Sequence, residues 1–450
     1  MQPIQRRTLP YQIDSQTLFE RLRPLGDAIF LDSGRPACPW GRFDIITAAP
    51  VEKITCTQQD PTNPFPALDR LYRSHALPVE QADHLPFIGG LMGYFSYDLG
   101  RRLEQLPEQA ESSYALPDLN LGLYLWAVVV DHTLKQSTLV ASPEVDNAQL
   151  EQIEYRLLNG TARPSDSFQL LQPFSSNISA LQYQQKLASI DEYIQAGDCY
   201  QVNFAQRFHS RYQGDPWQAY RLLRTAAPTP YSAYIDTDQG AILSLSPEQF
   251  LQVRQGQVQT RPIKGTRPRS ADPETDAALK AELQQSAKDR AENLMIVDLL
   301  RNDLSRICEH HSVKAPELFK VESYANVHHL VSTVTGQLPK DCSAVQLLAH
   351  CFPGGSITGA PKIRAMEIIE ELEPHRRSIY CGSIGYLSLC GRMDTSITIR
   401  TLLCEQDSIY CWAGGGIVAD SVTDMEYEET FNKVNNLLNC LNNTYQKKPG

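Results

Sequence analysis

A lysine in a basic segment is the first feature of the sequence that could do chemistry. Lys264 precedes Gly265, and the same segment carries Arg261, Arg267 and Arg269. Permanent positive charge nearby favours the neutral form of an amine, and a neutral lysine can act as a nucleophile. Gly265 has no Cβ, so a ligand can approach the backbone beside this amine. A solvated basic turn would have the same composition, and only the rest of the chain distinguishes the two interpretations.

A glutamate at the end of an apolar stretch is a candidate general acid. Residues 241–246 are expected to form a strand, and Glu248 follows after Pro247. Apolar surroundings at a strand end would raise the pKa of the carboxyl and keep a proton available for transfer. An exposed glutamate in a turn is the alternative interpretation.

Carboxylates one helical turn apart occur on two predicted helices. Asp289 and Glu292 share a face of a long helix predicted over 273–302, and Glu426 and Glu429 share a face of the predicted C-terminal helix. Because an apolar run follows Glu292, that end of the helix is expected to be buried, and its carboxylates need a partner. Carboxylate oxygens are suitable ligands for Mg²⁺, and water and substrate oxygens usually complete its coordination. Surface ion pairs would explain both clusters equally well.

Groups that could bind carboxylates lie between and beyond these helices. Arg400 ends a predicted strand, and the glycines at 414–416 offer backbone amides. The segment 354–362 has the glycine spacing of a phosphate-binding loop, but Ala360 stands where that loop requires lysine, which excludes a nucleoside triphosphate site. The helix start that follows can still receive a carboxylate. Together these residue types describe a pocket for a small polyanion.

The elements that must position these residues form a mixed pattern of strands and helices. A polar stretch from 142 to 179 is expected to connect two halves. Ser179 and Gln182 form a capping box that starts a helix ending near Gly197. The other predicted elements are a helix at 15–23 and strands at 28–31, 87–95, 121–130 and 199–208.

The composition is that of an ordinary globular protein, with 42% hydrophobic and 21% charged residues. A net charge of −11 argues against a nucleic-acid partner. No apolar run follows the basic N-terminus, and the longest apolar stretch, 119–130, is too short to cross a bilayer, so we expect neither a secretory signal nor a membrane partner. Eleven cysteines without a Cys-x-x-Cys spacing indicate reduced thiols and a cytoplasmic protein.

Several motifs occur together and in a fixed order. They are Pro262-Ile263-Lys264-Gly265-Thr266, Asp289-Arg290-Ala291-Glu292-Asn293, Gly354 to Lys362, Asp394-Thr395 with Ile399-Arg400, Gly414-Gly415-Gly416, and Glu429-Thr430 to Lys433. Over roughly residues 180–440 this set resembles that of the chorismate-utilising enzymes, and ordered motifs are more specific than any single one. The resemblance implies an α+β fold like that of anthranilate synthase component I, in which antiparallel β-sheets pack as a sandwich flanked by helices. It also implies an N-terminal region, 1–150, with tryptophan-pocket residues, and a chorismate-binding catalytic region, 178–441.

The lysine at position 264 distinguishes between the activities that occur among the enzymes of this family. Members that convert chorismate and ammonia to 4-amino-4-deoxychorismate, for 4-aminobenzoate and folate, carry a lysine at the position of Lys264, whereas anthranilate synthases carry alanine. Isochorismate and salicylate synthases place a water-activating lysine in the strand where this chain has Gln201. The implied activity is therefore the amination of chorismate. An anthranilate synthase large subunit and a non-catalytic, tryptophan-binding regulatory paralogue are the alternatives.

The resemblance also implies a role for each residue. Lys264 would attack C2 of chorismate while Glu248 protonates the departing C4 hydroxyl, and ammonia would then add at C4 and expel the lysine. Mg²⁺ held by Glu292 and Glu429, with Glu426 nearby, would bind the ring carboxylate. The residues expected to hold the substrate or line its pocket are Gly265, Thr266, Arg301, His329, Tyr380, Arg400, Gly414, Gly415, Gly416 and Lys433.

A tryptophan pocket between the two halves is a further feature of the family. The resemblance places it at Ser33, Trp40, Gly41, Arg42, Phe43, Pro230, Tyr231 and Ser232. Asp32 stands beside this serine where glutamate or histidine is common. Bound tryptophan is therefore an expectation of the resemblance, as a regulatory or a structural ligand.

The ammonia would have to come from another protein. The chain contains no Gly-x-Cys-x-Gly sequence, which marks the nucleophile of a glutamine amidotransferase. A separate glutamine amidotransferase subunit is therefore expected as the partner in a heterodimer.

Overall fold

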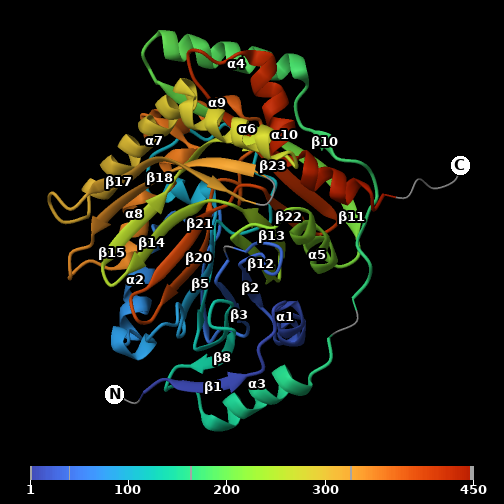
Figure 1. The fold of residues 1–450 in the computed structure, drawn as a ribbon, viewed down its shortest axis with the longest axis vertical. Coiled ribbons are helices and arrows are strands. Elements are labelled where there is room, and N and C mark those ends of the chain that lie inside the picture. The colour runs from blue at the N-terminus through green and yellow to red at the C-terminus, as the bar shows by residue number, and fades with distance from the viewer. Residues whose placement is uncertain (1–2, 40, 163–164, 325–326, 446–450) are drawn as a thin grey trace, which may run out of the picture.

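Two antiparallel sheets form the framework of the computed structural model, which describes residues 3–39, 41–162, 165–324 and 327–445 (Figure 1). The larger sheet contains, in spatial order, β1 (Gln5–Leu9), β8 (Gln136–Ala141), β7 (Trp126–Asp131), β3 (Phe43–Thr47), β2 (Ile29–Asp32), β12 (Tyr231–Thr237), β13 (Gly240–Ser246), β22 (Thr401–Glu405), β23 (Ser408–Ile417), β11 (Gln201–Gln213) and β10 (Ser175–Ser176), and β9 (Gln169–Leu170) and β19 (Gly359–Ala360) also pair with β11. The smaller sheet contains β16 (Ile263–Pro268), β18 (Val327–Gln337), β15 (Gln257–Arg261), β14 (Gln249–Arg254), β21 (Met393–Ile397), β20 (Ser383–Ser388), β5 (Gly90–Phe95), β6 (Leu119–Tyr124) and β4 (Glu52–Cys56), and β17 (Lys314–Ser323) pairs with β18.

Ten α-helices of the described ranges surround the sheets. They are α1 (Gln16–Leu22), α2 (Phe65–Ser74), α3 (Asn147–Asn159), α4 (Ala180–Gln195), α5 (Pro216–Ala226), α6 (Pro273–Gln285), α7 (Ala287–Ser305), α8 (Ala344–Cys351), α9 (Lys362–Leu372) and α10 (Thr423–Asn442). The predicted α+β fold of antiparallel sheets flanked by helices is confirmed. Within these ranges, none of the helices has both the length and the apolar surface that a bilayer crossing requires.

Each sheet combines strands from the two ends of the chain. In the larger sheet β2 pairs with β12, and in the smaller sheet β5 pairs with β20. One hydrophobic core contains buried residues of both sheets, among them Phe30, Tyr94 and Leu243. The N-terminal region is therefore hydrogen-bonded into the same sheets that carry the candidate site.

The stretch 121–130 was predicted as one strand, and this prediction is wrong. The chain leaves the smaller sheet at the end of β6 and enters the larger sheet at the start of β7. Leu125 lies between the two strands, and its carbonyl accepts a hydrogen bond from the amide of Ser142. Because both strands are buried on both faces, the apolar run continues through the break and hides it.

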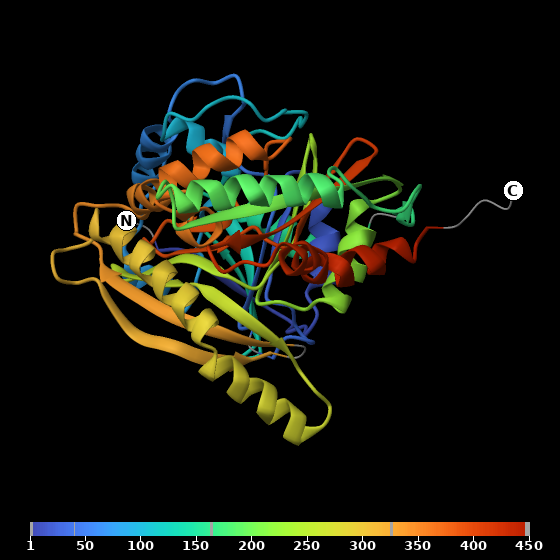
Figure 2. The same ribbon diagram turned by 90° about the horizontal axis from the view of Figure 1, so that it is seen from above.

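The helix predicted over 273–302 consists of two helices, which is a second correction. Ser286 leaves the helical conformation with a ψ of 111°, and its hydroxyl accepts the amide hydrogen of Asp289 at 3.2 Å, so that it caps α7. The preceding α6 extends from the body of the molecule in Figure 2, and within it only Leu283 is fully buried. Helical spacing continues across the break, so periodicity alone did not reveal it.

A smaller hydrophobic core lies beneath α4. The predicted capping box of Ser179 and Gln182 is confirmed, and Tyr183, Leu187 and Ile190 are buried against residues of α9 and β11. In Figure 1, α4 lies above α9 and α10, and in the view from above in Figure 2 it runs between them. This helix layer covers the end of the larger sheet at which β11, β19 and β23 meet.

Candidate active site

Lys264 lies on β16 with its amine directed into the protein. Its Nζ donates a hydrogen bond to the carbonyl oxygen of Ser356 at 3.2 Å. Burial lowers the pKa of this amine, and the ammonium of Lys433 lowers it further, against the opposing effect of Glu248. The structure therefore favours a neutral, nucleophilic amine.

The predicted source of this pKa shift is wrong. The arginines of the segment are ion-paired with carboxylates: Arg261 with Glu322, Arg267 with Glu282 and Asp289, and Arg269 with Asp276. The cation that acts on Lys264 is Lys433 of α10, about 170 residues further along the chain. Sequence proximity suggested the arginines, whereas burial and a distant lysine produce the shift.

Glu248 follows β13 and is only 5% exposed. Burial raises the pKa of this carboxyl to about 7, although a hydrogen bond from Ser356 and the charge of Lys264 oppose the rise. Ser356 thus contacts both reactive groups, with its carbonyl oxygen on the amine and its hydroxyl on the carboxyl. Apart from its place in a glycine-rich loop, no feature of the sequence pointed to Ser356.

The predicted magnesium ligands approach one another from α7 and α10. The ammonium of Lys288 lies 3.9 Å from a carboxylate oxygen of Glu292 and 4.0 Å from one of Glu426. Burial raises the pKa values of both carboxyls, and the charges of nearby lysines, among them Lys288, oppose this rise without cancelling it. Glu429 pairs with Lys433 at 2.6 Å, and this ammonium holds the pKa of Glu429 below its usual value despite burial.

These carboxylates fit a magnesium ion whose coordination is completed by oxygens of the substrate and of water. Gly415 has no side chain, and a Cβ there would lie 3.2 Å from a carboxylate oxygen of Glu426 and 3.6 Å from one of Glu429. Among the described residues, no three His, Cys, Asp or Glu side chains converge closely enough to enclose a metal ion by themselves. Mg²⁺ commonly binds through one or two carboxylates, which matches this donor set.

A half-buried arginine, Arg400, lies close to His329. No described residue forms an ion pair or hydrogen bond with the guanidinium of Arg400, and burial lowers its pKa. Burial and the charge of Arg400 lower the pKa of His329 to about 3, so the imidazole is neutral, and its Nδ1 lies 2.9 Å from the hydroxyl of Thr266. An unpaired arginine in such surroundings is suited to a substrate carboxylate.

Of two other predicted substrate residues, Arg301 lies apart from this cluster, whereas Tyr380 packs against β23, which carries the glycines at 414–416. Arg301 is half a helical rotation away from Glu292 on α7, and its exposed side chain pairs with Asp298 at 2.9 Å. Tyr380 is buried and stacks on Trp412 at a centroid distance of 6.2 Å. The structure brings Lys264, Glu248 and the α7 and α10 carboxylates together, but it does not bring Arg301 to them.

Arg400 and Arg301 are therefore expected to respond differently to the same substitution. Arg400→Gln should raise the KM for a carboxylate substrate about 100-fold, because hydrogen bonds to a charged group contribute roughly 1.5–3 kcal/mol. Arg301→Gln removes the same charge from the exposed face of α7 and should leave KM unchanged. Steady-state kinetics with both variants measures the difference. Equal KM values for the two variants would contradict the placement of Arg400.

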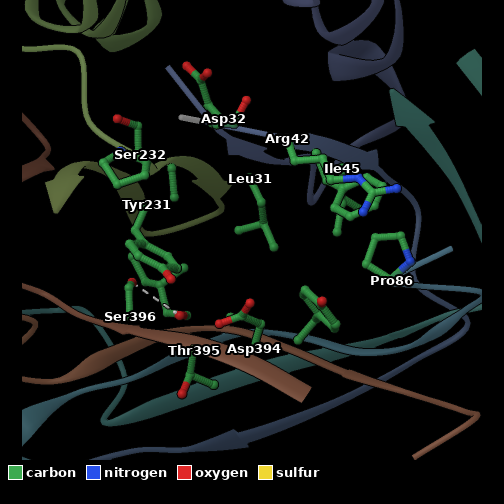
Figure 3. Close-up of a pocket in the computed structure, with 18 of the residues that line it drawn as sticks. Leu31, Asp32, Arg42, Ile45, Pro86, Tyr231, Ser232, Asp394, Thr395 and Ser396 are labelled. Atoms are coloured by element: carbon green, nitrogen blue, oxygen red, sulfur yellow. Dashed lines mark hydrogen bonds between the residues drawn. The ribbon is translucent and has the colours of Figure 1, made fainter. Parts of the chain in front are cut away.

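A cavity of about 260 Å³ lies between the two sheets at the predicted tryptophan residues (Figure 3). All the described residues that were predicted for that pocket line the cavity, and the remaining one, Trp40, lies outside the described residues. Asp32 accepts hydrogen bonds from Arg224 at 2.6 Å and Tyr220 at 2.9 Å. Asp394 also lines the cavity, and burial raises the pKa of its carboxyl to about 6, against hydrogen bonds from Gln252 and Gln249.

Comparison with known proteins places this geometry in a family. The model of the chorismate binding enzymes matches residues 27–439. The chain is 51% identical to aminodeoxychorismate synthase component 1 of Escherichia coli, over 94% of this chain and 95% of that protein. It is 42% identical to anthranilate synthase component 1 of Thermus thermophilus, over 83% and 82% of the two chains.

Solved structures agree with the sequence comparisons. Anthranilate synthase component I from Streptococcus pneumoniae superimposes with a TM-score of 0.78 at 33% identity, over 89% of this chain and 92% of that chain. A menaquinone-specific isochorismate synthase from Escherichia coli has the same fold, with a TM-score of 0.76 at 19% identity, over 98% and 95% of the two chains. The matched family model, the relatives and the arrangement around Lys264 lead to one conclusion: this chain belongs to the chorismate binding enzymes.

Proposed function

We propose that this chain converts chorismate and ammonia to 4-amino-4-deoxychorismate. The observation that carries the proposal is Lys264, a buried amine of lowered pKa that shares Ser356 with the protonatable carboxyl of Glu248. The identity of 51% to aminodeoxychorismate synthase component 1 of Escherichia coli, against 42% to anthranilate synthase component 1 of Thermus thermophilus, supports it.

The proposed reaction uses the two groups in succession. Neutral Lys264 attacks C2 of chorismate, the ring double bonds shift, and the C4 hydroxyl leaves as water with a proton from Glu248. Ammonia then adds at C4, and the C2–Nζ bond breaks, which restores the diene and frees the lysine. Glu248, now ionised, can take the surplus proton, and the enolpyruvyl group is retained.

The remaining residues hold the substrate and support its charge. Glu292, Glu426 and Glu429 would hold Mg²⁺, which supplies positive charge for the ring carboxylate. Arg400 and Lys433 provide the two cations that face a dicarboxylic substrate, Arg400 from the segment between β21 and β22 and Lys433 from α10. Neutral His329, close to Thr266, offers a hydrogen bond without competing for a carboxylate proton.

Product identification tests this proposal. Incubation with chorismate, Mg²⁺ and ammonium should yield 4-amino-4-deoxychorismate, identified by chromatography and mass spectrometry. Anthranilate with pyruvate as the sole products would instead assign the chain to the rival activity. No turnover at all would favour the non-catalytic paralogue. For glutamine-dependent synthesis, the chain would require a separate amidotransferase subunit.

The cavity between the two sheets would bind tryptophan through its amino group. Burial raises the pKa of Asp394 to about 6, the charge of Arg254 opposes this rise, and no described residue forms an ion pair with the carboxylate. Asp394→Asn is expected to weaken tryptophan binding at least about 10-fold, since it removes the charged acceptor. Isothermal calorimetry at pH 8 measures this effect. Unchanged binding in the variant would exclude Asp394 as the ammonium partner.

A further inference from the structure

One of the carboxylates proposed to hold magnesium is itself held by a hydroxyl. Ser421 donates a hydrogen bond from its side chain to Oε1 of Glu426 at 2.8 Å, and Glu426 is only 5% exposed. The ammonium of Lys288 lies 4.0 Å from the same oxygen, which is too far for a hydrogen bond. Within the described ranges, Ser421 is therefore the hydrogen-bond partner that sets the direction of this carboxylate.

The turn between β23 and α10 fixes the direction of this hydroxyl. The amide of Ser421 donates to the carbonyl oxygen of Val418 at 2.9 Å, and the amide of Val418 donates to the hydroxyl oxygen of Ser421 at 3.1 Å. Because the Val418 amide occupies one lone pair of the oxygen, the hydroxyl is held in an orientation from which its hydrogen reaches Glu426. The turn thereby links the strand with the glycines at 414–416 to the helix with Glu426 (Figure 1).

The hydroxyl of Ser421 does not cap the helix that follows it. The N-cap position of α10 is Val422, and no side chain caps the first turn. A serine at the N-cap usually stabilises a helix, since its oxygen accepts a free amide hydrogen. Here α10 begins without that contribution, and the hydroxyl next to its start bonds a carboxylate one turn into the helix. Helix stability therefore does not explain the bond to Glu426.

The second carboxylate oxygen of Glu426 is directed at the glycine strand. A Cβ at Gly415 would lie 3.2 Å from Oε2 of Glu426, 3.6 Å from Oε1 of Glu429 and 3.7 Å from Nζ of Lys433. The ammonium of Lys433 lies 2.6 Å from Glu429 and 3.0 Å from the carbonyl oxygen of Gly414. With one oxygen bound to Ser421 and the other directed at Gly415, Glu426 has the arrangement of a carboxylate that binds a metal ion through one oxygen.

We propose that Ser421 is a positioning residue of the magnesium site. Its hydroxyl holds Oε1 of Glu426, so that Oε2 stays directed toward an ion above Gly415. The inference rests on the proposed function, in which Glu426 helps to hold Mg²⁺. Ser421 acts through Glu426 and not on the ion or on the substrate. Hydrogen-bond partners of metal ligands typically change metal affinity about 10- to 100-fold.

Three variants test the positioning role by metal binding. Ser421→Ala is expected to weaken Mg²⁺ binding about 10-fold, measured by isothermal titration calorimetry with MgCl₂ in the absence of chorismate. Ser421→Thr retains the hydroxyl and should keep the affinity of the unsubstituted protein. The matched control is Ser15→Ala, because Ser15 also precedes a helix without capping it and donates to a buried carboxylate, that of Asp44, at 2.6 Å. This pair lies at α1, away from α10 (Figure 1), so the control should bind Mg²⁺ normally.

Thermal unfolding separates positioning from a general loss of stability. Ser421→Ala and Ser15→Ala each remove one hydroxyl–carboxylate bond, so both should unfold at a slightly lower temperature in EDTA. Addition of MgCl₂ should raise the unfolding temperature of Ser15→Ala as much as that of the unsubstituted protein. The rise should be smaller for Ser421→Ala at the same MgCl₂ concentration, because a ligand stabilises the folded state in proportion to its occupancy. An equal rise in both variants would assign Ser421 a purely structural role.

The outcomes distinguish the inference from the function on which it rests. Unchanged Mg²⁺ affinity in Ser421→Ala, or an equal loss of affinity in Ser421→Thr, would overturn the positioning role. Failure of the unsubstituted protein to bind Mg²⁺ would instead overturn the magnesium site, and the role of Ser421 with it. If the unsubstituted protein binds Mg²⁺ but forms no 4-amino-4-deoxychorismate, the proposed activity is overturned, and the affinities of the three variants still decide the role of Ser421.

Discussion

Lys264→Ala is expected to abolish the covalent adduct with chorismate and to lower the rate of product formation about 10³-fold or more. Alanine removes the only proposed nucleophile, and Ser356 offers a carbonyl oxygen there, which cannot replace an amine. Intact-mass spectrometry of protein incubated with chorismate and Mg²⁺, without ammonia, measures the adduct. Product formation from ammonium measures the rate.

A matched lysine controls for the loss of positive charge. Lys320 lies on β17 of the same sheet, where it pairs with Glu317 at the surface. Lys320→Ala should retain both the adduct and the rate. If Lys264→Ala formed the adduct to the same extent as the unsubstituted protein, another nucleophile would carry the reaction, and the proposed chemistry of Lys264 would be excluded.

Glu248→Gln is expected to lower the activity without lowering the stability of the protein. The amide cannot deliver a proton to the departing hydroxyl, so the rate should fall about 10²- to 10⁴-fold. Glu405→Gln is the control, because Glu405 is equally buried but accepts hydrogen bonds from the amides of Ala115 and Leu116, away from Lys264. This control should keep its activity.

The stability effect of Glu248→Gln depends on pH with a definite sign. The pKa of Glu248 is about 7 in the folded state against 4.5 for the free group, so the folded protein holds this proton more tightly. Below pH 4.5 the carboxyl is protonated in the folded and the unfolded state, so it does not change the free energy of unfolding with pH. As the pH rises from 4.5 through 7, its ionisation lowers the free energy of unfolding by about 3 kcal/mol. Glutamine carries no charge, and the variant should therefore unfold at a higher temperature than the unsubstituted protein at pH 8, but not at pH 4.

Thermal unfolding at the two pH values and the pH profile of the rate check this behaviour. The acid form of Glu248 predominates below pH 7, so the rate of the unsubstituted protein should decline above that value. Toward low pH the rate should also decline, because Lys264 becomes protonated below its own lowered pKa. An equal unfolding temperature of protein and variant at pH 8 would show that burial does not raise the pKa of Glu248.

The sequence predicted correctly those features that depend on the spacing of residues within one element. Helical periodicity put Glu426 and Glu429 on one face of α10, and the capping box at Ser179 fixed the start of α4. Prediction from local sequence failed where the pattern continues through a break between two elements, which occurs between two strands at Leu125 and between two helices at Ser286. The break at Leu125 depends on which sheet each strand joins, and that choice is made by packing between distant segments.

Only the tertiary structure decided the electrostatics of Lys264. The sequence determined that the chain carries an amine beside a glycine, a carboxyl after a strand, and acidic pairs on two helices. It did not determine that the neighbouring arginines are neutralised, that Lys433 and burial lower the pKa of the amine, or that Arg301 faces away. These facts depend on distances between residues far apart in the chain, because charge and desolvation act through space and not along the backbone.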